Sequence, residues 1–253
     1  NSNSKPEDFT PEVRAWRAYQ VEEVKKVLSK RAYLEQANRR EEIIDTLWTK
    51  EHGDTASYGR NWGYYVGLDN IRAYYVDGNK FGAPGTDICH PFTTYMIVIA
   101  DDNKTAQVTW YSIGYEINPA AGKDVDCYWD NQRCGADLVL EDGQWKIWHF
   151  QVMPDIMCPT CEPFTKQKPH DDFVPGDMPK VDAPTTFCEE YDVNKERKFW
   201  PQPPTPYETF EDSKKYCMTK PTAEDRIDYK FEYNQFTLQE YLEDLEKRDP
   251  WKE

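Results

Sequence analysis

Two strand-like runs of the sequence, residues 136–140 and 144–152, are separated only by Glu141-Asp142-Gly143. Asp-Gly between such runs is the strongest short-range signal for a β-hairpin. Two further runs of β-branched and aromatic residues, 94–100 and 105–115, flank a short polar turn in the same way. Because a hairpin joins neighbouring strands in opposite directions, the middle of the chain predicts an antiparallel sheet.

The longest predicted helix precedes these strands. Thr10 suits the N-cap and Pro11 the first helical position. Apolar residues then recur near helical spacing to about residue 38, which predicts one long helix with an apolar face. These apolar residues are Val13, Trp16, Val24, Val27, Leu28 and Leu34.

Shorter elements lie between this helix and the hairpins. Residues 41–48 and 68–75 predict two short helices, and the aromatic segment 58–66 predicts a strand that ends at Gly67. The order of elements is therefore helix, helix, strand, helix and then four strands. Helices that are separate from consecutive hairpins indicate an antiparallel α+β fold.

Three motifs in this order resemble a known superfamily. They are Asn-Trp-Gly-Tyr-Tyr-Val-Gly at 61–67, Asn-Ile-Arg-Ala-Tyr-Tyr at 70–75 and Asp-Gly-Gln-Trp-Lys-Ile-Trp-His at 142–149. From roughly Val13 to Pro154 the chain resembles the nuclear transport factor 2-like (SnoaL-like) superfamily. The resemblance implies a cone-shaped, curved antiparallel sheet wrapped around the long N-terminal helix, with a pocket for a small apolar molecule inside the cone.

The resemblance also implies a set of activities. The superfamily includes scytalone dehydratase, bile-acid 7α-dehydratase, ketosteroid isomerase and polyketide cyclases, which use His, Tyr and Asp without a metal or an organic cofactor. We therefore expect a cofactor-free acid/base lyase that acts on a hydroxylated aromatic or polycyclic small molecule, by dehydration or retro-aldol-type elimination. Two alternatives stay open, because fold does not fix function: a non-catalytic ligand carrier or assembly module, and an isomerase or cyclase.

His90 is the first candidate for proton transfer, because an imidazole titrates near neutral pH. By resemblance it corresponds to the catalytic histidine of the bile-acid dehydratase, just before the central hairpin. The Tyr and Asp on the first helix of that enzyme fall on Arg31 and Gln36, and its strand Asp falls near Gly114. Of the residues in that catalytic pattern, only the histidine is matched.

Two further residues are catalytic candidates. Period-two alternation puts His149 on one strand face with Trp145 and Ile147, so His149 points into the cone if that face lines it. The alternative is a hydrogen-bonded core histidine. Tyr33, late on the first helix, is the candidate donor of a phenolic proton to a leaving hydroxyl or developing oxyanion, with ordinary packing as the alternative.

Aromatic residues of the segment 58–66 are candidates for substrate binding. Alternation puts Trp62 and Tyr64 on one face and Tyr65 on the other, so at most one set faces the cavity, with core packing as the alternative. Cys158 and Cys161 form a Cys-x-x-Cys motif, but a structural zinc site needs four ligands and no second pair exists. We therefore expect unpaired thiols, no metal and no cofactor.

The chain changes character after the last strand. Thirteen of the 18 prolines lie at or after Pro154. Residues 1–10 are predicted to be a tail and 11–157 the SnoaL-like domain. Residues 158–253 are predicted to form an extended arm that wraps the domain or a neighbouring subunit. The arm ends in a helix at about 237–248, where Thr237 and Glu240 form a capping box.

The charge and cysteine content exclude some partners. The net charge of −15 argues against binding nucleic acid, which needs a basic surface, and against anionic membranes. No apolar run approaches the roughly 20 residues of a membrane span. Seven irregularly spaced cysteines predict free thiols in a reducing cytoplasm. An open sheet face and an aromatic arm need cover, so we expect a homodimer or homotrimer.

Overall fold

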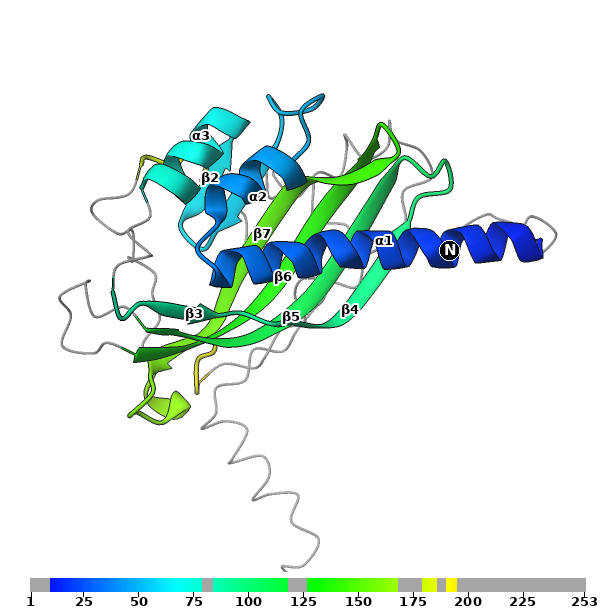
Figure 1. Ribbon diagram of the computed structural model, residues 1–253. Coiled ribbons are helices and arrows are strands. Elements are labelled where there is room, and N and C mark those ends of the chain that lie inside the picture. Colours follow the sequence, from blue (N-terminus) through cyan, green and yellow to red (C-terminus); the bar gives the residue numbers. More distant parts are fainter. Residues whose placement is uncertain (1–9, 79–83, 118–126, 168–178, 186–189, 195–253) are drawn as a thin grey trace, which may run out of the picture.

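A curved sheet wraps one long helix in the computed structural model, which describes residues 10–78, 84–117, 127–167, 179–185 and 190–194. Figure 1 shows helix α1 (Pro11–Gln36) crossing the concave face of the sheet. The predicted α+β fold, with a curved sheet around the N-terminal helix, is confirmed. The tail residues 1–9 and the predicted helix at 237–248 lie outside the described residues.

Helix α1 begins as its sequence predicts. The Thr10 Oγ1 atom accepts a hydrogen bond from the Val13 backbone N–H at 3.3 Å, and Pro11 takes the first helical position. The face toward the sheet buries Val24 and Leu28, whereas Val13 and Trp16 of the predicted apolar face are exposed. Within the described ranges no helix combines the length and the apolarity that crossing a membrane requires.

The segment after α1 folds as helix α2 (Arg40–Leu47), strands β1 (Ser57–Arg60) and β2 (Gly63–Val66), and helix α3 (Leu68–Arg72). A π-helical turn, η2 (Ala73–Asp77), continues α3. The single strand predicted for 58–66 is thus a hairpin of two strands. Its turn is possible because Gly63 adopts a φ of 145°, which a residue with a Cβ atom rarely takes.

The rest of the sheet consists of β3 (Asp87–Cys89), β4 (Phe92–Ile99), β5 (Thr105–Ile117), β6 (Cys127–Glu141) and β7 (Gln144–Pro159). The strand order is β2-β1-β7-β6-β5-β3, and β4 also pairs with β5. All neighbours are antiparallel except β1 and β7, which are parallel. The two predicted hairpins, β4–β5 and β6–β7, are present.

Strands β6 and β7 are longer than the predicted runs 136–140 and 144–152. Strand β7 continues through Pro154, although proline cannot donate a hydrogen bond to a neighbouring strand. The register shifts at this point, where Gln132 pairs with Pro154 and the next residue, Asp155, is left as an extra one. Such a bulge tolerates the missing donor. The predicted domain end at residue 157 therefore falls inside β7.

The two faces of the sheet have different surroundings. The inner face points toward α1 and carries the packed rings of Tyr58, Trp110 and Phe150, with centroids of neighbouring rings 5.3 to 5.5 Å apart. The outer face leaves several large apolar side chains exposed, which keeps self-association a reasonable prediction. These exposed side chains are Met96, Tyr111, Ile113 and Trp129.

Residues 179–185 of the C-terminal arm lie on β2 of their own chain. The Tyr64 backbone donates to the Ala183 carbonyl at 2.8 Å, and the Asp182 backbone donates to the Tyr64 carbonyl at 2.8 Å. The Asp182 carboxylate also accepts the Val66 N–H at 2.7 Å. These contacts satisfy polar groups at the edge of the sheet. Most of the arm lies outside the described residues.

Candidate active site

His90 lies on the inner face of the sheet, in the connection between β3 and β4, with 8% of its side chain exposed. Its ring lies against Gly114 of β5. A Cβ atom on Gly114 would lie 2.5 Å from His90 Cδ2 and would also meet the Cys89 carbonyl oxygen. The absence of a side chain at this position is therefore what lets the imidazole approach the strand.

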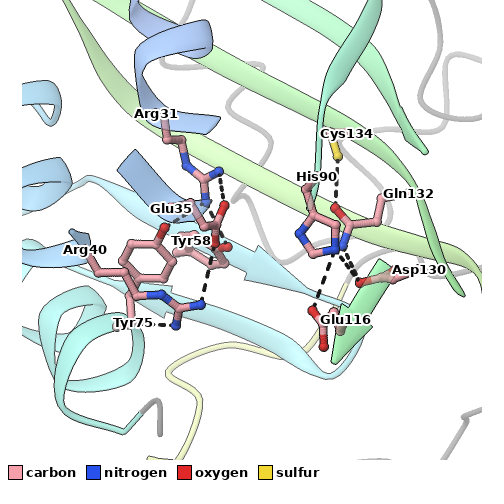
Figure 2. Close-up of polar contacts among 10 residues, drawn as sticks. All are labelled: Arg31, Glu35, Arg40, Tyr58, Tyr75, His90, Glu116, Asp130, Gln132 and Cys134. Atoms are coloured by element: carbon pink, nitrogen blue, oxygen red, sulfur yellow. Dashed lines mark hydrogen bonds and ion pairs between the residues drawn. The ribbon is translucent and has the colours of Figure 1, made fainter. Parts of the chain in front are cut away.

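Two carboxylates meet this imidazole. His90 Nε2 lies 3.3 Å from Asp130 Oδ2 and 3.7 Å from Glu116 Oε1 (Figure 2). The sheet register explains the arrangement, because Asp130 pairs with Gly114 across the β5–β6 ladder and Glu116 follows Gly114 by two residues on the same face. Gln132 Nε2 donates to Asp130 Oδ2 at 2.6 Å and helps to fix that carboxylate. We call His90, Glu116 and Asp130 the His90 group.

Burial and charge act in opposite directions within the His90 group. Burial alone would lower the pKa of His90, but its contact with Asp130 and the charges of Asp130 and Glu116 raise that pKa above its ordinary value. Burial and the Asp130 charge raise the pKa of Glu116. Burial would also raise the pKa of Asp130, yet contact with His90 keeps it low. Asp130 is thus ionised, while the raised pKa values of His90 and Glu116 favour the protonated form of each group.

A second buried group lies beside the first and comes from the helices. Glu35 pairs with Arg31 at 2.8 Å and with Arg40 at 3.8 Å (Figure 2). Burial would raise the pKa of Glu35, but the two guanidinium charges lower it to about 2. Glu35 therefore stays ionised and holds the arginines in place. We call Glu35, Arg31 and Arg40 the Glu35 group.

Arg31 links this group to the aromatic wall of the inner face. Its guanidinium carbon lies 3.9 Å from the centroid of the Phe150 ring, and its Nη2 donates to the Tyr58 hydroxyl at 3.3 Å. Burial raises the pKa of Tyr58, while the Arg31 charge opposes that rise. The Tyr58 phenol is therefore neutral at physiological pH. In Figure 2 the second ring nitrogen of His90, Nδ1, is on the side that faces Glu35 and Tyr58.

His149 lies on the outer face, opposite the predicted one. Trp145 donates to Gln20 of α1 at 2.7 Å, and Phe150 lies under Arg31 of the same helix. Trp145 and Phe150 therefore lie on the same inner face. Because they are five residues apart, the alternation has to break between them. It breaks at Trp148, because Asp137 pairs with His149 but the next residue of β6 pairs with Ile147. His149 therefore points away from the His90 group.

The surroundings of His149 match the alternative of a core histidine. The side chain is 1% exposed, and its Nδ1 lies 2.9 Å from the Ser57 hydroxyl. Burial, with a smaller contribution from the charge of His52, lowers the pKa of His149 to about 3. The imidazole is therefore neutral at physiological pH.

The other predicted site residues are divided between inside and outside. Tyr33 is 76% exposed, and the structure does not bring it to His90. Tyr65 stacks on Tyr74 in the core, with ring centroids 4.2 Å apart, and Trp62 Nε1 donates to the Tyr65 hydroxyl at 3.2 Å. Tyr64 instead accepts a hydrogen bond from Gln151 at 2.9 Å. Alternation does not apply to Trp62, because it lies in the β1–β2 turn.

Three acidic site residues were missed by the sequence analysis. Glu35 is one residue before Gln36, the position to which the resemblance pointed. Glu116 is two residues beyond Gly114 on the same face. Asp130 belongs to a stretch that looked like a loop, because residues 130–133 are all polar and show no apolar alternation. The sequence pattern therefore does not mark this inner strand face.

The His90 group is also the candidate for a metal centre. One ligand atom from each of its residues lies within 4.8 Å of the others, and one imidazole with two carboxylates is a set that divalent transition metals accept. The predicted absence of a metal stays a prediction. Cys158 is buried and Cys161 exposed, and neither joins a three-residue ligand cluster in the part of the chain that the structure describes.

Three solved structures are similar to this chain at low sequence identity. An NTF2-like protein with a cystatin-like fold from Novosphingobium aromaticivorans is 14% identical, with 57% of this chain and 90% of that chain covered and a TM-score of 0.44. The hexachlorocyclohexane dehydrochlorinase LinA-type3 of Novosphingobium barchaimii is 13% identical, with 57% of this chain and 92% of that chain covered and a TM-score of 0.46. ActVI-ORFA of Streptomyces coelicolor is 16% identical, with 54% of this chain and 97% of that chain covered and a TM-score of 0.43.

The sequence itself identifies the family. No curated protein matches the chain. The family model described as SnoaL-like domain matches residues 16–151, which is more than half of the 253 residues and includes most of α1, the His90 group and the first half of β7. The family lies within the NTF2-like superfamily, in agreement with the fold. The chain therefore belongs to the SnoaL-like domain family.

Proposed function

We propose that this protein is a cofactor-free acid/base lyase that acts on a hydroxylated aromatic or polycyclic small molecule. The observation that carries the proposal is the position of His90, buried on the inner face with one ring nitrogen between two carboxylates. Such an environment tunes an imidazole for proton transfer near neutral pH. The neighbouring aromatic rings of Tyr58, Tyr74 and Phe150 suit a planar apolar substrate.

In the proposed reaction, His90 Nδ1 removes a proton from a carbon next to the carbon that bears the hydroxyl. The electrons of the C–H bond form a double bond, and the C–O bond breaks. Asp130 holds the opposite nitrogen, Nε2, and stabilises the imidazolium that forms. This arrangement fixes both the ring orientation and the nitrogen that reacts.

Tyr58 is the proposed acid, in place of the exposed Tyr33. Its neutral phenol donates a proton to the departing hydroxide, which leaves as water, and the Arg31 guanidinium stabilises the phenolate that remains. Proton transfer from His90 to Tyr58, through water, then restores both groups. Glu35 is a poor base because two arginines lower its pKa to about 2. Burial raises the pKa of the Cys134 thiol, which stays neutral.

An isomerase or cyclase would use the same proton shuttle, without loss of water or of a carbon fragment. A carrier would bind the molecule and leave it unchanged. The three functions differ in the mass and the structure of the product, so they can be separated without knowing the substrate in advance.

The test is a mass-spectrometric screen of the purified full chain. The protein, treated with EDTA, is incubated with a panel of hydroxylated bicyclic aromatics, polyketide-like phenols and steroids. Loss of water or of a carbonyl fragment from one compound is the expected result. A product of changed structure but unchanged mass would indicate an isomerase or cyclase instead of a lyase. Compounds that the protein retains without changing them would indicate a carrier. Activity that EDTA abolishes and Zn²⁺ or Mn²⁺ restores would assign the His90 group to a metal.

A further inference from the structure

Arg60 is a cation that the proposed elimination does not use. It is the last residue of β1, two positions after Tyr58, so alternation puts both side chains on the inner face. Ser57 and Gly59 take the outer face, where Ser57 contacts His149. Burial would lower the pKa of Arg60, but Tyr74, Tyr58 and the charges of Asp130 and Glu116 raise it, so Arg60 lies within electrostatic range of the His90 group.

Arg60 is half-buried and, within the described residues, lacks the ion-pair partner that Arg31 and Arg40 have. Its Nε is buried and makes no hydrogen bond, and within the described residues no carboxylate forms an ion pair with it. Among the described residues its guanidinium contacts the Trp62 ring, whose centroid lies 4.9 Å from the guanidinium carbon. A cation–π contact leaves the N–H donors at the edge of a guanidinium available. Arg31 and Arg40, by comparison, share Glu35.

The charges around Arg60 favour an anion. The Glu35 group has two guanidinium groups and one carboxylate, so it carries one positive charge. The His90 group carries one negative charge when a single proton resides on either His90 or Glu116. These two charges offset each other. Arg60 then adds a positive charge that no described residue neutralises, and a divalent cation would increase this excess whereas an anion removes it.

We propose that Arg60 binds a carboxylate of the substrate, whose class is therefore an acidic, hydroxylated aromatic or polycyclic molecule. The inference rests on the proposed function in placing that molecule beside His90. A guanidinium offers a carboxylate two parallel N–H donors. Trp62 stacks under the guanidinium and, with Tyr74, adds an aromatic surface next to the acid group, their rings meeting edge to face at 6.2 Å. Trp62 contacts the Arg60 guanidinium, and Tyr65 accepts a hydrogen bond from Trp62, so both residues position the carboxylate site.

The test is equilibrium binding, which needs no turnover. The full chain is titrated with 2-naphthoate, 3-hydroxy-2-naphthoate and the corresponding primary amides, at constant ionic strength, by calorimetry and tryptophan fluorescence. We expect the acid of at least one pair to bind about tenfold or more tightly than its amide, because charge-assisted hydrogen bonds replace neutral ones. Arg60→Gln removes this preference, and Arg60→Lys retains part of it.

Arg72→Gln is the matched control, because Arg72 pairs with Asp45 and Glu41 away from the sheet interior and its loss leaves the preference unchanged. Equal binding of acid and amide by the unmodified protein overturns the inference, even where Arg60→Gln fails to fold. A preference that survives in folded Arg60→Gln overturns it as well. If binding shows an Arg60-dependent preference but no compound of the mass-spectrometric panel is converted, the lyase is refuted and the carboxylate site stands.

Discussion

The two faces of the sheet each bury a histidine, and the two histidines have opposite properties. His90, on the inner face, meets two carboxylates that raise its pKa. His149, on the outer face, meets the Ser57 hydroxyl and the Trp148 ring, and burial lowers its pKa to about 3. Both side chains are nearly inaccessible to solvent. The surrounding charges, and not burial, therefore decide which histidine can exchange a proton at neutral pH.

The largest expected effect separates the two histidines directly. Using the substrate that the screen identifies, His90→Gln should lower kcat by about 100-fold or more, because general-base catalysis contributes about that much. His149→Asn, which keeps a hydrogen-bonding group beside Ser57, should change kcat by less than about threefold while lowering stability by about 1–3 kcal/mol. The measurements are steady-state kinetics and urea unfolding. A loss of kcat in the folded His149→Asn protein that equals the loss in His90→Gln would bring the outer face into the mechanism.

Gly114→Ala should damage the inner face at the Cys89-His90 segment. The added Cβ would lie 2.1 Å from the Cys89 carbonyl oxygen and 2.5 Å from His90 Cδ2, so this segment and its imidazole have to move away from Asp130. We expect a loss of kcat approaching that of His90→Gln and a loss of about 1–3 kcal/mol in stability from overpacking. Kinetics and urea unfolding measure the two effects.

Gly143→Ala is the control for this variant. Gly143 has a φ of 74° and nothing within 4 Å of an added Cβ, so alanine there costs stability through backbone strain alone. We expect comparable destabilisation with unchanged kcat. If the two alanine variants lose kcat equally, the contact between Gly114 and His90 does not matter for the reaction.

The contrast between the faces also explains what the sequence could predict. Strands with apolar alternation and tight turns were found, including the hairpin at Asp142-Gly143, where both residues adopt a positive φ. The first half of β6 was not, because its inner face carries Asp130, Gln132 and Cys134 where a core strand carries apolar residues. Functional residues break the pattern from which strands are inferred. The face of His149 was missed because a bulge at Trp148 leaves no mark in the sequence.

Asp130→Asn should shift the pH profile of the inner histidine. The raised pKa of His90 means that the basic form prevails only above that pKa, so the acid limb of kcat/KM for the unmodified protein lies above pH 6.5. Removing the Asp130 charge lowers the pKa of His90 and moves this limb to lower pH. The plateau rate should also fall by about tenfold or more, because the imidazolium loses its partner. Asp45→Asn, which changes a carboxylate paired with Arg72, is the control. An unmoved limb in Asp130→Asn would separate Asp130 from the proton transfer.

The smallest effect concerns the outer histidine and the stability of the fold in acid. His149 has a pKa of about 3 in the folded protein and an ordinary value of 6.5, so between these values the unfolded chain binds one more proton than the folded chain. Stability is therefore present above pH 6.5 and falls by about 1.4 kcal/mol per pH unit as the pH drops through this window. The His90 contribution has the opposite sign, since its pKa is raised, and is lost as the pH rises above 6.5.

Urea unfolding at pH 6.5, 5.5 and 4.8 should show the unmodified protein losing stability relative to His149→Asn at that slope, above the range in which Glu35 titrates. Parallel losses in the two proteins would mean that the outer histidine is protonated without unfolding, and that the two buried histidines are more alike than their neighbours suggest.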